Sequence, residues 1–178
     1  IVFDFGNVVI RWSIAALMDE FFADPDELAH FLDNVLTPAD NLRADLGAPL
    51  ADVVADLIDR SPEHRAPLEA WRDRWIEMAQ PEISGSVAIL TALKARGVPV
   101  FALSNFGVDS FAVALRHYPW LDAFDRRYLS GQLGVMKPDP EIYRIVEADC
   151  GVAPGALLFA DDKRANVEAA VARGWQGH

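Results

Sequence analysis

Residues 1–10 read IVFDFGNVVI, a short apolar run that is interrupted by Asp4 and Gly6. Such a run is typical of a buried parallel strand whose carboxyl end carries a polar group. From residue 84 onward, segments with helical spacing alternate with short β-rich runs. Strands that alternate with helices predict right-handed crossovers and a doubly wound, mostly parallel sheet of the α/β class. The alternating segments are, in order, SVAILTALKARG, VPVFALS, VDSFAVALRHY, RRYLSG, DPEIYRIVEADCG, ALLFA and NVEAAVARG.

The intervening segment, residues 11–83, shows helical spacing alone. Apolar residues recur three and four positions apart in IAALMDEFF, DPDELAHFLDNVL, PLADVVADLIDR and EHRAPLEAWRDRWIEM. This segment has 16 acidic and 6 basic residues, a net charge of −10, whereas the rest has 11 acidic and 10 basic residues, a net charge of −1. We therefore predict a core made of residues 1–10 and 84–178, with an all-helical module, residues 11–83, inserted into it.

Composition excludes several classes of protein. A chain of 178 residues with 52% hydrophobic content can bury one substantial core. Its net charge of −11 argues against a nucleic-acid partner, because a phosphate backbone needs a basic surface. No apolar stretch approaches the roughly 20 residues of a membrane span. The single cysteine, Cys150, excludes an intrachain disulfide and fits the reducing cytoplasm, where we place the protein.

The two ends of the sequence suggest a trimmed chain, because it starts at Ile1 and stops soon after a helix-like segment. We expect a last strand or two to lie beyond residue 178. Oligomeric state cannot be derived from these patterns.

Polar side chains fall at the carboxyl ends of the predicted strands, where an open parallel sheet binds its ligands. Each is a weak signal alone, because a single Asp or Ser there is commonly a helix cap or a turn former. Together they bring three carboxylates, one ammonium and one hydroxyl into one cleft. These residues are Asp4, Ser104 with Asn105, Lys137, and Asp161 with Asp162.

This combination suits phosphoryl transfer to water. Clustered carboxylates raise one another's pKa unless a hard cation lies among them, and Mg²⁺ is the usual occupant of such oxygen sites. The metal and Lys137 would neutralise phosphate oxygens, and Ser104 would donate a further hydrogen bond. Asp4 is then the in-line nucleophile and forms an aspartyl-phosphate that water opens. A small phosphorylated molecule is the expected partner.

The ordered segments DFGNV, LSN, KPDP and FADD, the last followed by NVEAA, resemble the four motifs of haloacid dehalogenase-like hydrolases. The helical insertion after the first motif resembles the type 1 cap of that superfamily. The resemblance covers essentially the whole chain and implies a Rossmann-like core with an inserted helical cap. The Gly-Asn pair after the nucleophile makes the sequence similar to a bacterial subgroup that includes sugar 1-phosphate phosphatases.

The resemblance also implies a role for each matching residue. Asp4 is implied as nucleophile and metal ligand, and the Gly6 carbonyl as a second metal ligand. The phosphate binders implied by the motifs are Ser104 and Lys137, to which we add Asn105. The remaining matches are Asp161 and Asp162, which bind Mg²⁺ directly or through water, and Asn166, which like Asn105 is interpreted first as organising a loop.

Gly6 departs from the family pattern. Phosphatases of this superfamily usually carry a second Asp there, which protonates the leaving oxygen and then activates water. General acid–base catalysis contributes about 10²- to 10⁴-fold. Another group, for example from the cap, could replace it, or the reaction could be slow, or the leaving oxygen could be acidic already. Our hypothesis from Gly6 is a preference for acidic leaving groups, such as those of sugar 1-phosphates or acyl phosphates.

The cap is expected to select the substrate, because a lid over the cleft also excludes water. Candidates that face the cleft are Trp12, His30, Asn41 and Arg43. Arg43 could clamp a substrate carboxylate or phosphate, or it could pair with the nearby Asp45. Four apolar residues have the spacing of one face of a helix, and we interpret them as its packing face: Leu68, Trp71, Trp75 and Met78.

Two other functions fit parts of the pattern. A 2-haloacid dehalogenase of this superfamily uses the same Asp nucleophile and Lys, with an Arg from the cap and no metal. Arg43 permits that interpretation, but the pair Asp161 and Asp162 argues against it, because a metal-free mechanism does not need two adjacent carboxylates. A protein that binds phosphate without turnover, having lost the acid at position 6, is the second alternative. The segment DFG is not a kinase motif, because no glycine-rich loop or strand lysine precedes it.

Overall fold

A computed structural model describes all residues, 1–178, and contains one five-stranded sheet in the order β3-β2-β1-β4-β5. Every pair of neighbouring strands is parallel. From the central β1 the chain moves outward through β2 and β3, and then crosses to the other side of β1 to form β4 and β5, so the sheet is doubly wound as predicted. The strands are β1 (Val2–Phe3), β2 (Phe101–Ser104), β3 (Arg126–Leu129), β4 (Leu158–Ala160) and β5 (Gln176–Gly177).

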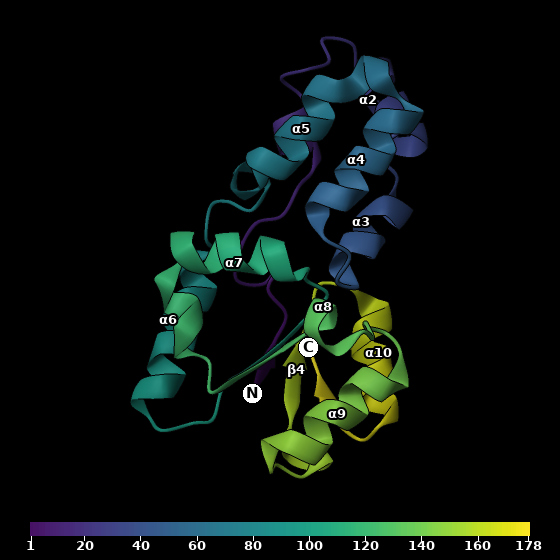
Figure 1. Cartoon of the computed structure of the whole chain (residues 1–178). Coiled ribbons are helices and arrows are strands. Elements are labelled where there is room, and N and C mark those ends of the chain that lie inside the picture. Colours follow the sequence, from purple (N-terminus) through teal and green to yellow (C-terminus); the bar gives the residue numbers. More distant parts are fainter.

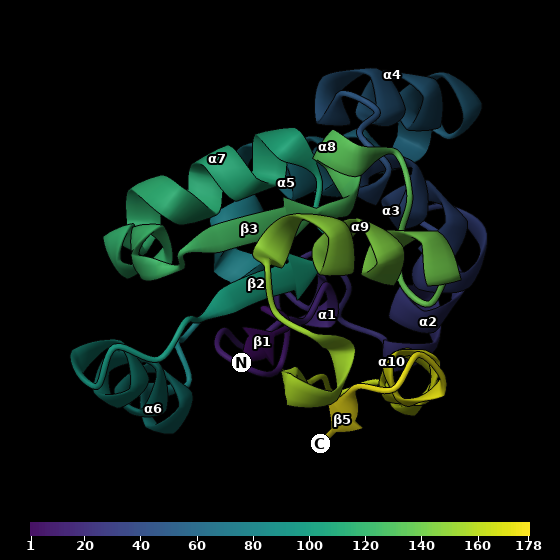
Figure 2. The same ribbon diagram turned by 90° about the horizontal axis from the view of Figure 1, so that it is seen from below.

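The helices of the core cover both faces of the sheet. Figure 1 shows α6 and α7 on one side of the strands and α9 and α10 on the other, and Figure 2 shows β1, β2 and β3 side by side. The bounds are α6 (Ser84–Ala95), α7 (Val108–His117), η3 (Pro119–Ala123), α8 (Ser130–Leu133), α9 (Pro140–Cys150), η4 (Pro154–Ala156) and α10 (Arg164–Ala172).

Alternating side chains along the strands explain the two layers, because successive residues of a strand point to opposite faces. Phe3 and Ala102 belong to the apolar cluster that includes Phe111 of α7. Their neighbours Val2 and Leu103 belong to a second cluster, which contains the buried apolar residues of α9 and α10. Both faces of the sheet are therefore buried, as the near-continuous apolar strands require.

The segment between β1 and α6 contains helices and no strand. In Figure 1 the helices α2 to α5 stand over the end of the core. One cluster of 30 buried apolar residues runs through this segment and through the α6–α7 face of the core. The division into a core and a cap at residues 11–83 therefore stays our proposal. The helices are α1 (Ala15–Met18), α2 (Pro25–Asn34), α3 (Pro38–Asp45), α4 (Leu50–Arg60), η1 (Pro62–His64), α5 (Arg65–Asp73) and η2 (Trp75–Met78).

Several local predictions are confirmed and others are wrong. The predicted packing face Leu68, Trp71, Trp75 and Met78 is buried. The segment EHRAPLEAWRDRWIEM, expected as one helix, is divided between η1, α5 and η2, and IAALMDEFF forms only the single turn of α1. The edge strand β5 was not predicted, because Gln176 and Gly177 carry no strand pattern.

Helix α3 was also missed, although its start has a clear signal. Thr37 and Asp40 form a capping box, in which the Asp40 N–H donates to Thr37 Oγ1 and the Thr37 N–H donates to Asp40 Oδ2. Pro38 occupies the first turn, where its missing N–H costs no hydrogen bond. The sequence Thr-Pro-x-Asp therefore specifies where this helix begins.

The end of α3 docks on the core through close backbone contacts that glycine permits. A Cβ atom on Gly47 would lie 2.5 Å from the carbonyl oxygen of Gly131, and one on Gly107 would lie 2.6 Å from the carbonyl oxygen of Ala44. Leu50 N–H, at the start of α4, donates to Asp109 Oδ2 on α7 at 3.1 Å. The contacts fix the C-terminal turn of α3 against the loop that follows β2 and against α8, which follows β3. Across the whole chain, no helix is both long and apolar enough to cross a membrane.

We predict that Gly107→Ala destabilises the protein by about 1–3 kcal/mol, because the new methyl group meets backbone that cannot move aside. Gly85→Ala is the control: a Cβ atom there meets nothing within 4 Å, and Ala is the better helix former. The free energy of unfolding in urea measures both. Equal stability of Gly107→Ala and the natural protein would contradict the tight docking of α3.

Candidate functional site

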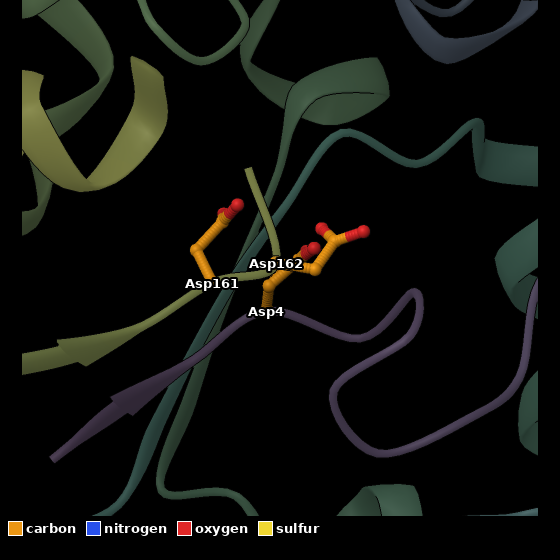
Figure 3. Close-up of side chains that lie close together, drawn as sticks. All are labelled: Asp4, Asp161 and Asp162. Atoms are coloured by element: carbon orange, nitrogen blue, oxygen red, sulfur yellow. The ribbon is translucent and has the colours of Figure 1, made fainter. Parts of the chain in front are cut away.

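Three carboxylates meet at the carboxyl edge of the sheet. Asp4 directly follows β1, and Asp161 and Asp162 directly follow β4, the neighbouring parallel strand. This is the point where the strand order reverses, which is where open α/β sheets bind ligands. Figure 3 shows the side chains of the three residues gathered at these two strand ends, and one carboxylate oxygen of each lies within 4.8 Å of the others. Asp4 and Asp161 are buried and Asp162 is exposed.

Lys137 and Ser104 complete the cluster that the sequence predicted. Lys137 is buried, and its Nζ lies 2.8 Å from Asp4 Oδ1 and 2.6 Å from Asp161 Oδ2. Ser104, the last residue of β2, donates its Oγ hydrogen to Asp4 Oδ1 at 2.7 Å. Asp4 Oδ1 thus has two donors, whereas Oδ2 has no partner within the protein and is free to react.

Asp161 and Asp162 differ in their partners. Both oxygens of Asp161 accept from Asn166 Nδ2, at 2.9 and 3.0 Å, and Oδ1 also accepts from the Lys163 N–H at 2.8 Å. With Lys137 added, the protein alone saturates the Asp161 carboxylate. Asp162 has a single long contact, to Asn7 Nδ2 at 3.4 Å. Asp162 therefore has free oxygen atoms for a ligand, and Asp161 mainly positions Lys137.

The electrostatics of the cluster fit a bound cation. Burial raises the pKa of Asp4, and the charge of Asp161 raises it further, while Lys137 and Ser104 lower it. Oxygen ligands of this kind and number match the preference of Mg²⁺. Gly6 lines the same cavity, beside Asn7. Asn7 adopts a left-handed conformation with φ of 55°, which Asn tolerates better than most residues.

Asn105 ties two loops of the site together. Its Oδ1 accepts from the Lys137 N–H at 2.8 Å, and its Nδ2 donates to the Lys137 carbonyl at 2.9 Å. This is the loop-organising role that the sequence suggested for it. Since both ends of the amide are engaged by the backbone of Lys137, direct phosphate binding by Asn105 would require these bonds to break. Asn166 is similarly engaged by Asp161.

A cavity of about 540 Å³ opens above the cluster. Its polar floor, which Asp161 does not join, consists of Asp4, Gly6, Asn7, Ser104, Asn105, Lys137, Asp162, Lys163 and Asn166. Its apolar lining, which we call the apolar wall, comes mostly from the helical segment. Within it the rings of Trp12 and Trp75 pack in a tilted arrangement, with centroids 5.2 Å apart and 31° between their planes. The apolar wall comprises Ile10, Trp12, Ile14, Leu32, Leu36, Leu42, Trp75, Ala79 and Phe106.

Two of the four cleft candidates lie in the cavity. Trp12 and Asn41 line it, whereas His30 lines a separate depression beside Phe22. Arg43 does not line the cavity, and its guanidinium forms an ion pair with Asp56, at 2.5 Å.

The expected roles of Arg43 as a substrate clamp, or as a partner of Asp45, are therefore wrong. Residue 43 is two positions from both 41 and 45, about 200° around a helix, and so projects from the opposite face of α3. His30 lies on α2 and faces the separate depression.

Asp45 is the cavity residue that sequence reasoning overlooked as a functional group. It is the last residue of α3, it lines the cavity, and its Oδ2 accepts from Asn41 Nδ2 at 2.8 Å. Burial raises the pKa of Asp45 to about 7, although the charge of Lys163 and the N–H of Gly107 act in the opposite direction. The capping signal of α3 and the four-residue spacing from Asn41 would have indicated this cavity-facing position.

Comparisons with known proteins identify relatives of the chain. Residues 1–174 match the model of the haloacid dehalogenase-like hydrolases. The chain is 29% identical over 184 aligned positions to a D-ribitol-5-phosphate phosphatase of Bacteroides thetaiotaomicron, covering 94% of this chain and 84% of that protein. It is 36% identical over 91 residues to a sesquiterpene phosphatase of Aspergillus oryzae, covering 51% of this chain and 46% of that protein, so less than half of that relative is matched.

A solved structure provides a comparison over the whole fold. The enzyme is a haloacid dehalogenase family member from Bacteroides thetaiotaomicron, in complex with magnesium and inorganic phosphate. The TM-score is 0.76 at 21% identity, and the match covers 99% of this chain and 91% of that chain. The fold is therefore shared, and since the family model spans nearly every residue, the chain belongs to the haloacid dehalogenase-like hydrolases.

Proposed function

We propose that this hydrolase is a Mg²⁺-dependent phosphatase, which hydrolyses a small phosphorylated metabolite through an aspartyl-phosphate on Asp4. The observation that carries the proposal is the contact of Lys137 and Ser104 with Asp4, beside two further carboxylates. A nucleophile, phosphate-neutralising donors and metal ligands thus lie in one cavity. The names of both relatives, a polyol-phosphate phosphatase and a sesquiterpene phosphatase, support the same reaction class.

Asp4, Asp162 and the Gly6 carbonyl would hold the metal ion. Asp161 is better suited to act through water, because Lys137, Lys163 and Asn166 already donate to its oxygens. When bound, Mg²⁺ neutralises phosphate charge and allows the carboxylates to stay ionised together. The polar floor and Asp161 behind it thus account for every residue that the family resemblance implies, and Asn105 and Asn166 act through the loops that they hold together.

The residues of the chain then perform the reaction in two steps. Lys137 Nζ and Ser104 Oγ bind phosphate oxygens and hold the phosphorus in line with Asp4 Oδ2. A bond forms between Oδ2 and phosphorus as the bond to the leaving oxygen breaks, which gives the aspartyl-phosphate. Water then attacks this phosphorus and releases inorganic phosphate and the Asp4 carboxylate.

The cavity favours substrates whose organic part is at least partly apolar. A sugar 1-phosphate, the candidate suggested by Gly6, would place several hydroxyl groups against the apolar wall. The helical segment offers only Asn41 and Asp45 as polar partners there. Hydroxyl groups buried without partners cost about 1–3 kcal/mol each. We therefore rank monoesters of apolar alcohols before sugar 1-phosphates. The name of the sesquiterpene phosphatase indicates a substrate of the apolar class for that relative.

Dehalogenation is less well supported. The cap arginine that this reaction uses has no counterpart in the cavity, because Arg43 pairs with Asp56 on the outside. Asp161 and Asp162 would add negative charge to a metal-free site. A binding protein without turnover remains the second alternative, and turnover itself distinguishes it.

We predict that Asp4→Asn lowers hydrolysis of 4-nitrophenyl phosphate by at least about 10³-fold, because the amide cannot attack phosphorus. EDTA is expected to abolish the activity of the natural protein, and Mg²⁺ to restore it. The matched control is Asp59→Asn, which removes an exposed carboxylate at the end of α4 and leaves the rate unchanged. Phosphate binding without any turnover would establish the alternative of a binding protein.

Arg43→Ala is expected to change kcat/KM for phosphate esters by less than about twofold and stability by less than about 1 kcal/mol, since the exposed Arg43–Asp56 pair faces away from the cavity. Steady-state rates and thermal unfolding measure the two effects. Chloride release from a 2-haloacid in EDTA, lost in Arg43→Ala, would instead establish the dehalogenase.

The apolar wall predicts a lower KM for hexyl phosphate than for glycerol 3-phosphate, two primary alkyl phosphates that differ mainly in polarity. Trp12→Ala should raise the KM for hexyl phosphate by about tenfold or more, because burial of apolar groups contributes about 25 cal/mol per Å². It should have a smaller effect on glycerol 3-phosphate. A lower KM for glycerol 3-phosphate in the natural protein would contradict this ranking.

A further inference from the structure

The proposed phosphatase reaction needs a general acid, and the position at which the family carries that acid is a glycine here. When Asp4 attacks phosphorus, the leaving oxygen becomes an alkoxide unless a nearby acid protonates it. Position 6, where the family places that acid, is Gly6 and has no side chain. We propose that Asp45, on α3 of the helical segment, is the general acid that protonates the leaving oxygen and then the general base that activates water. This inference rests on the proposed function.

Asp45 lines the cavity from a different element than Asp4 does, as a proton donor to the leaving oxygen must. In an in-line displacement, the nucleophile and the leaving oxygen lie on opposite sides of phosphorus. Asp4 reaches the cavity from the end of β1, whereas Asp45 reaches it from α3, in the helical segment that stands over the core (Figure 1). The apolar wall, which would receive the organic part of the substrate, includes Leu42 of the same helix. A leaving oxygen next to that wall is therefore on the Asp45 side of the phosphate.

The position of Asp45 is fixed by contacts on both its side chain and its backbone. Asn41 Nδ2 donates to Asp45 Oδ2 at 2.8 Å, and the N–H of Gly107 is near enough to the same carboxyl group to lower its pKa. The carbonyl oxygen of Asp45 accepts from Ser130 Oγ at 2.5 Å. Gly107 and Gly131 allow the flanking backbones to approach closely. The carboxyl group is thus held relative to the core, and a general acid needs such fixed placement.

The surroundings of Asp45 suit proton transfer near neutral pH. Burial raises its pKa to about 7, so both the protonated and the ionised form are populated there. The charged groups that face it are Lys163, which lowers the pKa, and Asp4, which raises it. Helix α8, with the sequence SGQL, and residues 105–107, with the sequence NFG, contribute no titratable side chain. Asp109 nearby is occupied by the N–H of Leu50.

The proton returns to its origin over one cycle. In the first step the oxygen–phosphorus bond of the ester breaks, the electron pair goes to the leaving oxygen, and the proton of Asp45 joins it to give the alcohol. In the second step the Asp45 carboxylate takes a proton from water as the water oxygen bonds to phosphorus. The Asp4–phosphorus bond then breaks, which releases phosphate and restores protonated Asp45.

The proposal changes the expected substrates. If the leaving oxygen receives a proton from Asp45, then the acidic leaving group that Gly6 seemed to demand is no longer required. Esters of ordinary alcohols become substrates, in agreement with the apolar alcohols that the cavity favours.

The test compares two leaving groups in the natural protein and in Asp45→Asn. Hexyl phosphate needs a proton on its poor leaving oxygen, whereas 4-nitrophenyl phosphate does not. With Mg²⁺, kcat/KM of the variant should fall about 10²- to 10⁴-fold for hexyl phosphate and about tenfold or less for 4-nitrophenyl phosphate. Asp59→Asn is the matched control for the loss of one carboxylate. Equal losses on both esters, or no loss on hexyl phosphate, would overturn the assignment.

Two further readouts separate catalysis from misfolding. Because Asp45 also activates water, the variant should show a burst of nitrophenolate followed by slow turnover, as aspartyl-phosphate accumulates. In the natural protein, kcat/KM for hexyl phosphate should fall as the pH rises through about 7, because the acid form is lost, and the variant should lack this fall. Asp45→Ala should regain activity on hexyl phosphate with added formate, which a misfolded protein would not do.

The proposed function and the role of Asp45 fail in distinguishable ways. If the natural protein hydrolyses neither ester, or if Asp4→Asn retains full activity, the proposed function is wrong. The role of Asp45 alone is wrong under a different set of results. In that case the natural protein hydrolyses the esters and Asp4→Asn is inactive, but Asp45→Asn shows no burst and keeps the natural pH profile.

Discussion

The ammonium group of Lys137 lies between Asp4 and Asp161, and the arrangement of the other polar groups depends on this buried contact. Two carboxylates on adjacent strands would repel each other in a buried site, and one lysine offsets one of their charges. With Asp162 included, three ionised carboxylates and one ammonium leave a net charge of −2. A divalent cation balances that charge. The reciprocal bonds between Asn105 and the backbone of Lys137 then hold the lysine in place.

The second constraint is the docking of α3 on the core. Where Gly47, Gly107 and Gly131 meet the opposing backbone, the absence of side chains brings the helical segment close to the strand ends. A single residue of that segment, Asp45, thereby shares a cavity with Asp4, from which it is separated by 41 positions in the chain. The proposed proton donor thus depends on packing between distant backbones, and none of the four family motifs contains it.

The sequence predicted the sheet and the polar floor for a simple reason. The carboxyl ends of parallel strands meet at one edge, so the residues that follow each strand can be placed before any tertiary contact is known. Arg43 and His30 were misplaced because the face of a helix that meets the cavity depends on where the helix begins and how it docks. Once Thr37 marks the start of α3, Asn41 and Asp45 fall on one face and Arg43 on the other. β5 is two residues long, too short for any periodic pattern.

The apolar cluster that runs from the helical segment into the α6–α7 face also limits how the molecule can open. A lid that swung away as a rigid body would expose Phe106, Trp75 and their neighbours to water, at a cost that grows with the area uncovered. We therefore expect the substrate to enter through the existing opening of the cavity, with only small movements of the surrounding loops.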